Sequence, residues 1–543
     1  MADGSARAAP GSPPTYTPPM QLRKNNRGVL LAPVALFVIA AGIALWRIWP
    51  VHAGMVGFDS AASVLYFDRI VAGRHLESFI AATPKPLLTL VDGTIHALFG
   101  DWRPISFLSI VVYAGDVVLG TELARRLAGR AAAGFAAVGL VGSWLLLEDA
   151  SAAYAVGWAL LGWLVAGLLL TRPRARYGLA GVALLVAGMA RFETLIVDGL
   201  VLVVLVGLAL ASRFLPADRR PSAPPRAAWL LLLAFGTFPV QALHDVLLTG
   251  DPLWSEQVAA LASPGAPLMT PLGAMAWIRL HYLGMAPLLL LGMTGVVALA
   301  QRRAWHILVG LVALGPGVLA FIVFLAVRKI YISARYLSPA DLAVLFAAAI
   351  GVAELRARAL DGALRRFRAT RRLTSLHPLV PLIAGGLVAA AVVTQFGPLD
   401  VGLRQKITNN RLLFENLDAA HAALDQELAR VPGVRDWPTN PSLDRAHDPP
   451  HRTLLVPVLL QPQVAVDFGL PLTSVGGLSG PDLTRPGYLA PGQILYHDPR
   501  NDLPVDSFRV IEISQPSRIA NVLVSPVAVD QGRHTWLLRV EQP

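Results

Sequence analysis

Residues 57–100 read GFDSAASVLYFDRIVAGRHLESFIAATPKPLLTLVDGTIHALFG. This stretch mixes charged, polar and apolar residues and lies between two long apolar runs, at 29–49 and 105–124. A helix rises about 1.5 Å per residue, so about 20 apolar residues are enough to cross the hydrocarbon core of a bilayer. The quoted stretch is therefore expected to be a loop between two membrane spans. It has no proline between Phe58 and Ile80, so we expect it to include a helix that lies along the membrane surface.

The composition of the whole chain is that of a membrane protein. The 543 residues are 55% hydrophobic and only 15% charged, and the mean hydropathy is +0.55. Soluble domains are typically about 25% charged, so most of this chain is expected to be solvated by lipid. This apolar composition excludes a cytosolic enzyme, a disordered protein and a nucleic-acid binder. The net charge of +11 does not indicate a nucleic-acid partner, because the basic residues lie in short loops between apolar runs. The absence of cysteine excludes disulfides, thiol nucleophiles and cysteine metal ligands.

Eleven apolar runs are predicted to be membrane helices. They lie at 29–49, 105–124, 131–148, 154–170, 179–190, 195–212, 227–248, 280–300, 305–326, 335–353 and 378–397. The stretch 179–212 is compatible with one long helix or with two short helices that meet at Arg191-Phe192-Glu193. The first run is also compatible with a cleavable signal peptide, but its length and its long polar leader favour an uncleaved anchor.

The distribution of arginine predicts the orientation in the membrane. Arginines gather in every second connection if 179–212 crosses twice, and the connection 354–377 alone holds seven of them. Short basic loops stay in the cytoplasm. We therefore expect a multi-pass protein of the cytoplasmic membrane, with its N-terminus inside. The loop 50–104 and the chain after the last span are then expected outside.

Three regions follow from these patterns. Residues 1–28 are polar and rich in Pro, Gly and Ser, so we expect a disordered cytoplasmic tail. Residues 29–397 are expected to form a polytopic α-helical membrane domain, and residues 398–543 a small extracytoplasmic α+β domain. The C-terminal domain is expected to contain a helix at 403–430 and a proline-rich linker at 432–453. Four strand-like runs are expected after the linker, at Leu454–Val466, Phe508–Ile513, Val522–Val529 and Trp536–Val540.

The polar residues of the first loop define the predicted site. In a helix, Asp59, Ser63 and Tyr66 are four and three residues apart and share one face. Asp68 comes nine residues after Asp59, which is about 180° round the helix at about 100° per residue. The two carboxylates are therefore not expected to enter one pocket. A solvated acid at the membrane interface is the alternative for each of them.

Short motifs follow one another along the chain in a particular order. They are Asp59-Ser60-Ala61, Ala72-Gly73-Arg74, Thr83-Pro84-Lys85-Pro86, Ala124-Arg125-Arg126-Leu127-Ala128-Gly129-Arg130, Met189-Ala190-Arg191-Phe192-Glu193, Gly250-Asp251-Pro252-Leu253-Trp254 and Ala334-Arg335-Tyr336-Leu337-Ser338-Pro339-Ala340. This order resembles the GT-C superfamily of membrane glycosyltransferases, especially the protein O-mannosyltransferase-like and aminoarabinose-transferase-like enzymes. Those enzymes carry D-E-A-Y-Y, E-G-R, K-P-P, R-P-E-G and R-Y-L-x-P-A motifs in this order. The resemblance covers roughly residues 29–355.

The resemblance implies a fold and an activity. It implies a GT-C-like membrane domain that moves a sugar from a polyprenyl-phosphate donor to an acceptor hydroxyl outside the membrane, on a cell-envelope glycan or a protein. Asp59 would be the base, and Lys85, Arg335 and Tyr336 would hold the donor phosphate. Residues expected to line the cavity are Ser63, Tyr66, Arg191, Glu193 and Trp254. Besides the bilayer and these substrates we expect no cofactor, metal or nucleic acid.

Two motifs depart from the family pattern. Ser60 occupies the place of the family's second acid, and Phe192 the place of the proline in R-P-E-G. A sugar or acceptor unlike the well-known ones is therefore expected. For Lys85 and Arg335 the alternative is a structural role as interfacial cations whose charged heads reach toward water.

A lipid or glycolipid transporter is the alternative function. Charged residues inside the membrane are expected in transporters too. Transporters place such charges midway through the bilayer and often contain inverted repeats. Here the strongest motifs share one predicted face and no repeat is visible, which favours sugar transfer.

Overall fold

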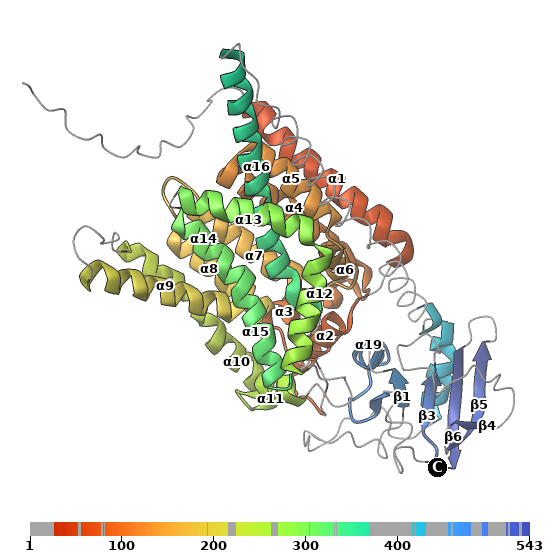
Figure 1. Ribbon diagram of the computed structural model, residues 1–543. Coiled ribbons are helices and arrows are strands. Elements are labelled where there is room, and N and C mark those ends of the chain that lie inside the picture. The colour runs from red at the N-terminus through yellow and green to blue at the C-terminus, as the bar shows by residue number, and fades with distance from the viewer. Residues whose placement is uncertain are drawn as a thin grey trace, which may run out of the picture.

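The computed structural model describes a helical body and a smaller mixed region (Figure 1). The described residues are 26–52, 56–77, 80, 82–192, 194–214, 224–261, 270–302, 304–330, 332, 334–368, 415–417, 419–430, 454–457, 460–478, 491–497, 517–519, 522–530 and 535–542. The expected tail before residue 26, the linker 432–453, and the runs 378–397 and Phe508–Ile513 lie outside them.

The first nine helices are α1 (Asn26–His52), α2 (Phe58–Val71), α3 (Pro86–Phe99), α4 (Arg103–Ala128), α5 (Arg130–Gly142), α6 (Trp144–Ser151), α7 (Ala155–Leu170), α8 (Tyr177–Ala190) and α9 (Thr194–Phe214). The later ones are η1 (Arg226–Gly236), α10 (Thr237–Thr249), α11 (Trp254–Leu261), α12 (Pro271–Gly284), α13 (Ala286–Gln301), α14 (Trp305–Val312), η2 (Ala313–Gly317), α15 (Val318–Val327), η3 (Ala334–Leu337) and α16 (Ser338–Arg368).

Long apolar helices confirm a polytopic α-helical protein. Within the described residues, five helical stretches are long and apolar enough to cross a membrane. The number is six if α12 and α13, which meet at a bend of 88°, form one span. Several shorter apolar helices accompany them, so the predicted total of eleven spans stays a prediction. The open question about 179–212 is answered, because α8 ends at Ala190 and α9 begins at Thr194.

The first loop contains two helices that pack side by side. The expected surface helix is present as α2, but it ends at Val71, before Ile80. α3 begins at Pro86, a residue suited to a first helical position because it has no N–H to leave unpaired. Gly93 allows the close packing, since a Cβ there would lie 2.2 Å from the Cβ of Phe67 on α2. This pairing places the residues just before α3 beside the face of α2.

The last part of the chain forms a mixed sheet, in agreement with the predicted α+β content. Its strands are β1 (Leu454–Pro457), β2 (Val475–Leu478), β3 (Ile494–His497), β4 (Ser517–Ile519), β5 (Val522–Asp530) and β6 (Thr535–Gln542), in the order β2-β1-β3-β6-β5-β4. β1 pairs in parallel with β2 and β3, and the other pairs are antiparallel. The strands predicted over Val522–Val529 and Trp536–Val540 are confirmed as β5 and β6.

The predicted strand over Leu454–Val466 is wrong in its second half. Only β1 is extended, and α19 (Gln461–Asp467) follows it. Pro462 in the first turn of α19 fits a helix start and lacks the donor that a strand needs. Within the predicted helix 403–430, the described residues 415–417 and 419–429 are helical.

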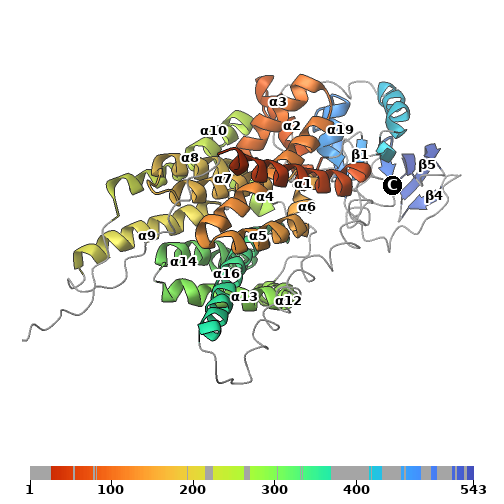
Figure 2. The same cartoon turned by 90° about the horizontal axis from the view of Figure 1, so that it is seen from above.

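The end of α19 and the segment that follows it dock on the first loop. Figure 2 shows α19 beside α2. The buried Arg69 guanidinium pairs with Glu77 at 2.8 Å and donates to the carbonyl oxygen of Leu470 at 3.2 Å. Trp102 Nε1 donates to Asp467 Oδ1 at 3.0 Å. The hydrogen bonds from Arg69 to Leu470 and from Trp102 to Asp467 cross between the two regions, so they hold the C-terminal part at the α2 end of the helical body.

Asp92→Asn is expected to weaken the dependence of stability on pH. Asp92 on α3 is 2% exposed, and burial raises the pKa of its carboxyl to about 7. An unfolded aspartate titrates near pH 4, so Asp92 makes the folded state lose stability as pH rises from about 4 to 7. Melting temperatures in detergent at pH 5 and pH 8 should therefore differ less in the variant than in the wild type. The matched control is Asp101→Asn, in a partly exposed side chain; an equal pH dependence in Asp92→Asn and wild type would contradict the assignment.

Candidate active site

Asp59 lies in the first turn of α2, and the start of this helix is fixed by a neighbouring loop. The Gly57 N–H donates to the carbonyl oxygen of Ala152 at 2.6 Å, and the Ser60 hydroxyl donates to that of Ala153 at 2.6 Å. No side chain fits at Gly57, because a Cβ there would lie 2.6 Å from the Tyr154 ring. Ser60, which replaces the family's second acid, therefore anchors the helix.

Two cations that are distant in the sequence meet at the Asp59 carboxylate. Lys85 Nζ lies 3.3 Å from Asp59 Oδ1, and Arg335 Nη1 lies 2.9 Å from Asp59 Oδ2. The three side chains are only 15%, 22% and 15% exposed for Asp59, Arg335 and Lys85, so solvent screens the charges weakly. Lys85 comes from the residue before α3 and Arg335 from η3, which leads into α16.

Aromatic rings flank both arginines of the site. The Arg335 guanidinium lies over the Tyr154 ring at 3.8 Å from its centroid, and Arg191 lies over the Tyr336 ring at 4.9 Å. Such stacking is favourable because the ring face is electronegative. Ala153, just before Tyr154, has a φ of 52°, a strained value for a residue with a Cβ. The strained turn thus places a ring against the cation that pairs with Asp59.

The charge state of Asp59 follows from these neighbours. Burial alone raises the pKa of its carboxyl. The positive charges of Lys85 and Arg335, with a further contribution from Arg191, outweigh this effect and hold the pKa well below its usual range. Asp59 is therefore ionised, and it is a weak base while both cations remain on it.

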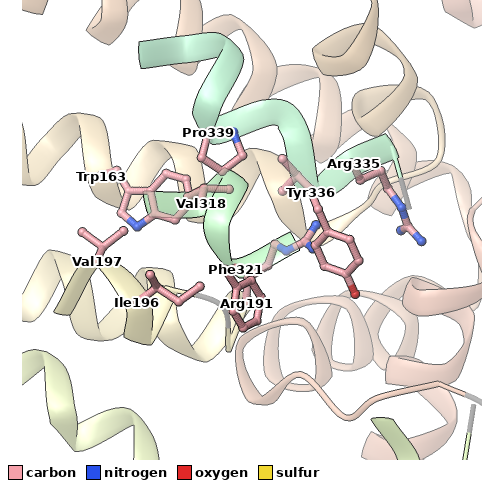
Figure 3. A pocket seen from close by; sticks show the side chains of 10 residues that line it. Trp163, Arg191, Ile196, Val197, Val318, Phe321, Arg335, Tyr336 and Pro339 are labelled. Carbon is pink, nitrogen blue, oxygen red and sulfur yellow. The ribbon is translucent and has the colours of Figure 1, made fainter. Parts of the chain in front are cut away.

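A small, largely apolar pocket opens beside the two arginines (Figure 3). It is lined by Val156, Trp163, Arg191, Ile196, Val197, Val318, Phe321, Arg335, Tyr336 and Pro339. In Figure 3, Trp163, Ile196 and Val197 lie on one side of the cavity and Arg335 on the opposite side. The pocket therefore presents apolar side chains at one end and a guanidinium at the other.

The structure brings together five of the predicted site residues. Asp59, Lys85 and Arg335 form one ion-paired group, and Tyr336 joins the cavity lining with Arg191. Asp68 lies apart, with Arg69 and His96 as its charged neighbours.

Other predicted cavity residues are buried elsewhere. Ser63 is 1% exposed and its hydroxyl donates to the Asp59 carbonyl oxygen at 2.8 Å, while Tyr66 is fully buried. Trp254 is 1% exposed and is absent from the lining of the described cavity. Glu193 lies outside the described residues.

Tyr154 and Asp149 belong to the site although their sequence context did not single them out. Asp149 lies on α6 and is within electrostatic reach of Arg335. The sequence offered one indication of both residues: Asp149 lies in the predicted outer loop 148–153, and Tyr154 directly follows that loop. No group of three or more His, Asp and Glu side chains within the described part of the chain could hold a metal ion.

Solved structures share this fold. The chain is similar to the oligosaccharyltransferase of Archaeoglobus fulgidus, with 12% identity, a TM-score of 0.51, and coverage of 86% of this chain and 69% of that one. It is similar to ArnT from Cupriavidus metallidurans, both in the apo state and bound to undecaprenyl phosphate. The apo comparison has 14% identity and a TM-score of 0.50 and covers 94% of this chain and 98% of ArnT. The comparison with the undecaprenyl phosphate complex has 15% identity and a TM-score of 0.50 and covers 95% of this chain and 98% of ArnT.

No family model matches the chain, and no curated protein is similar to it in sequence. The two structural neighbours are GT-C glycosyltransferases. The chain therefore shares the fold of these two neighbours, which is the fold that the order of its motifs indicated.

Proposed function

We propose that this protein transfers a sugar from a polyprenyl-phosphate donor to an acceptor hydroxyl on the outer face of the cytoplasmic membrane. The observation that carries the proposal is the Asp59 carboxylate between Lys85 and Arg335, next to an apolar cavity. ArnT, one of the structural neighbours, has been solved with undecaprenyl phosphate. A lipid-linked phosphate is the kind of ligand that needs both an apolar cavity and cations.

The charges of the site suit such a donor. Three cations, Lys85, Arg191 and Arg335, are grouped with two carboxylates, Asp59 and Asp149. This leaves one positive charge in excess within the described site. A sugar phosphodiester carries one negative charge, so its arrival would neutralise the group. Arginine is well suited to this contact because its planar guanidinium can donate two parallel hydrogen bonds to phosphate.

The reaction balances with one carboxylate. The acceptor oxygen attacks the anomeric carbon, the bond from that carbon to the phosphate oxygen breaks, and the electron pair leaves on the phosphate. The acceptor proton goes to Asp59. The leaving phosphate needs no acid because it departs as a stable anion, and Lys85 and Arg335 stabilise its growing charge. Glycoside hydrolysis, in contrast, needs a pair of carboxyl groups.

Donor binding also strengthens the base. In the empty site Lys85 and Arg335 hold the pKa of Asp59 far below the range of an effective base. A donor phosphate would compete with Asp59 for the same two cations. Each cation that turns to the phosphate stabilises the Asp59 anion less, so the pKa of the carboxyl rises. The acceptor is then activated only when a donor is present.

The orientation in the membrane is part of the proposal. The arginine-rich connections would lie in the cytoplasm, and the site with the C-terminal region would lie outside. Reporter fusions at about residues 220, 360 and 420 test this. The first two are expected to report the cytoplasm and the third the exterior, and an exterior signal at residue 360 would exclude this orientation.

The cell-envelope role is also proposed. The C-terminal region, docked beside α2, would help to hold a glycan or protein acceptor. No comparison favours the transporter alternative.

Lys85→Ala and Arg335→Ala are each expected to weaken binding of polyprenyl phosphate. Each removes one charge-assisted contact, which is typically about 1.5–3 kcal/mol, so affinity should fall by about 10- to 100-fold. Titration of purified protein with undecaprenyl phosphate in detergent measures this. Arg302→Ala, at an exposed arginine that pairs with Glu354 elsewhere on the helical body, is the matched control. Unchanged affinity in Lys85→Ala or Arg335→Ala would remove that residue from the phosphate site.

Asp59→Asn is expected to lose turnover by about 10²- to 10⁴-fold, the usual contribution of a positioned general base. The assay is transfer of radiolabelled sugar from a panel of polyprenyl-phosphate sugars to cell-envelope acceptors. Asp68→Asn is the matched control in the same helix and should keep most of the activity, because its charged neighbours are Arg69 and His96. Full activity in Asp59→Asn, or loss of activity in Asp68→Asn alone, would overturn the assignment of the base.

A further inference from the structure

The segment that carries Lys85 has few backbone N–H groups with which to stabilise its own conformation. It reads Thr83-Pro84-Lys85-Pro86, and both prolines lack an N–H group. Lys85 has an extended conformation, with φ −130° and ψ 98°. The segment therefore presents carbonyl oxygens that need donors from elsewhere in the protein.

Three buried side chains from two helices contact this segment or the residues close to it on either side. The Tyr66 hydroxyl on α2 donates to the carbonyl oxygen of Ala82 at 2.5 Å. Gln241 Nε2 on α10 donates to the carbonyl oxygen of Pro84 at 3.4 Å, and His244 Nε2 shares a hydrogen bond with the Thr89 hydroxyl at 3.0 Å. We call Tyr66, Gln241 and His244 the Lys85 cradle, because they contact the chain on both sides of Lys85. Their residues are 0%, 6% and 7% exposed.

The α10 side of the cradle is itself held in place. Gln241 Nε2 also donates to Asp245 Oδ1 at 3.0 Å and to Ser255 Oγ at 2.6 Å. Asp245 in turn accepts from the Ser255 N–H at 2.8 Å and from its hydroxyl at 2.7 Å. This network ties α10 to the start of α11. The Gln241 amide is thereby oriented toward the Lys85 segment, and buried polar networks of this kind are rigid when satisfied.

Lysine needs such support more than arginine does. Its ammonium is a point charge on a flexible four-carbon chain, so its position depends on where its backbone is held. Lys85 Nζ lies 3.3 Å from Asp59 Oδ1 and donates to the Thr83 carbonyl oxygen at 3.1 Å. Both contacts depend on the conformation of residues 82–85, which Tyr66 and Gln241 contact, whereas His244 holds the start of α3 that follows.

We infer that Tyr66, Gln241 and His244 are positioning residues that hold Lys85 against the donor phosphate. Tyr66 thus acts through the Lys85 segment and does not line the cavity. The inference rests on the proposed function, because it assigns to α10 a role in the affinity for the lipid phosphate. None of the three side chains needs to touch the substrate for this role.

The test uses two small changes in the full-length protein. Tyr66→Phe removes only the hydroxyl, and Gln241→Met removes the amide donor at similar volume. Each is expected to weaken binding of undecaprenyl phosphate by about 3- to 10-fold, the range for loss of one hydrogen bond. The KM for the acceptor should stay unchanged. The matched control is Gln257→Met, at a glutamine on α11 that donates to Asp251 and does not contact the Lys85 segment; it should bind the lipid as the wild type does.

A double-mutant cycle with Lys85→Ala separates positioning from general stability. If the cradle acts through Lys85, then Tyr66→Phe and Gln241→Met should change the affinity by less than about twofold in the Lys85→Ala background. The same loss in both backgrounds, or equal affinity of the wild type and the single variants, would overturn the inference. If the wild type binds the lipid and Lys85→Ala weakens it, the proposed function stands in either case. A wild type that does not bind the lipid would instead contradict the proposed function.

Discussion

The Asp59 carboxylate lies between the Lys85 ammonium and the Arg335 guanidinium, and this ion-paired group joins parts of the chain that are 276 residues apart. A buried charge is costly unless it is paired, so none of the three groups is stable there alone. Contacts from the surrounding structure hold these three side chains in place. The strained turn at Ala153 places Tyr154 against Arg335, Gly57 allows that turn to approach α2, and the C-terminal segment docks on the same loop.

In the mechanism that we propose, the same ion pairs explain how a weak base becomes an effective one. An aspartate whose pKa two cations hold far below its usual range is a poor acceptor for the proton of a hydroxyl group. A phosphate that draws these cations away would change the field at the carboxylate. The site holds one more positive charge than negative charges, so the incoming anion is attracted overall. This net attraction favours the exchange of ion pairs. In this account, donor binding and acceptor activation are coupled by electrostatics.

Much of the helical architecture was predictable from the sequence, because apolar runs and proline or glycine breaks act locally. The apolar helix α1 and the helix α2 follow from such patterns, and of the two alternatives for 179–212 the structure has the one with two helices. The order of motifs also predicted the fold and brought Asp59, Lys85 and Arg335 into one candidate site. The predicted strand after Leu454 was half wrong, since a proline-containing segment there turns into α19.

The parts that could not be predicted depend on contacts between distant segments. Tyr154 and Asp149 come to Arg335 only through the folded bundle, and Gln241 reaches Pro84 across 157 residues. Neither contact leaves a periodic signal in the sequence. Tyr66 shares a helical face with Asp59, but its hydroxyl bonds to a carbonyl of the segment before Lys85. A helical face indicates which residues are neighbours, whereas the partner of each side chain depends on the packing of other elements.

The most direct measurement is the affinity of Asp59→Asn for undecaprenyl phosphate, compared with that of the wild type. If the phosphate and Asp59 compete for Lys85 and Arg335, the variant should bind the lipid more tightly than the wild type, since the cations no longer have to leave a carboxylate. An asparagine keeps the size of the aspartate but only one of its two acceptor oxygens, so a melting curve must first verify that the variant is folded. Equal or weaker binding by a folded Asp59→Asn variant would contradict the exchange of ion pairs on which the account depends.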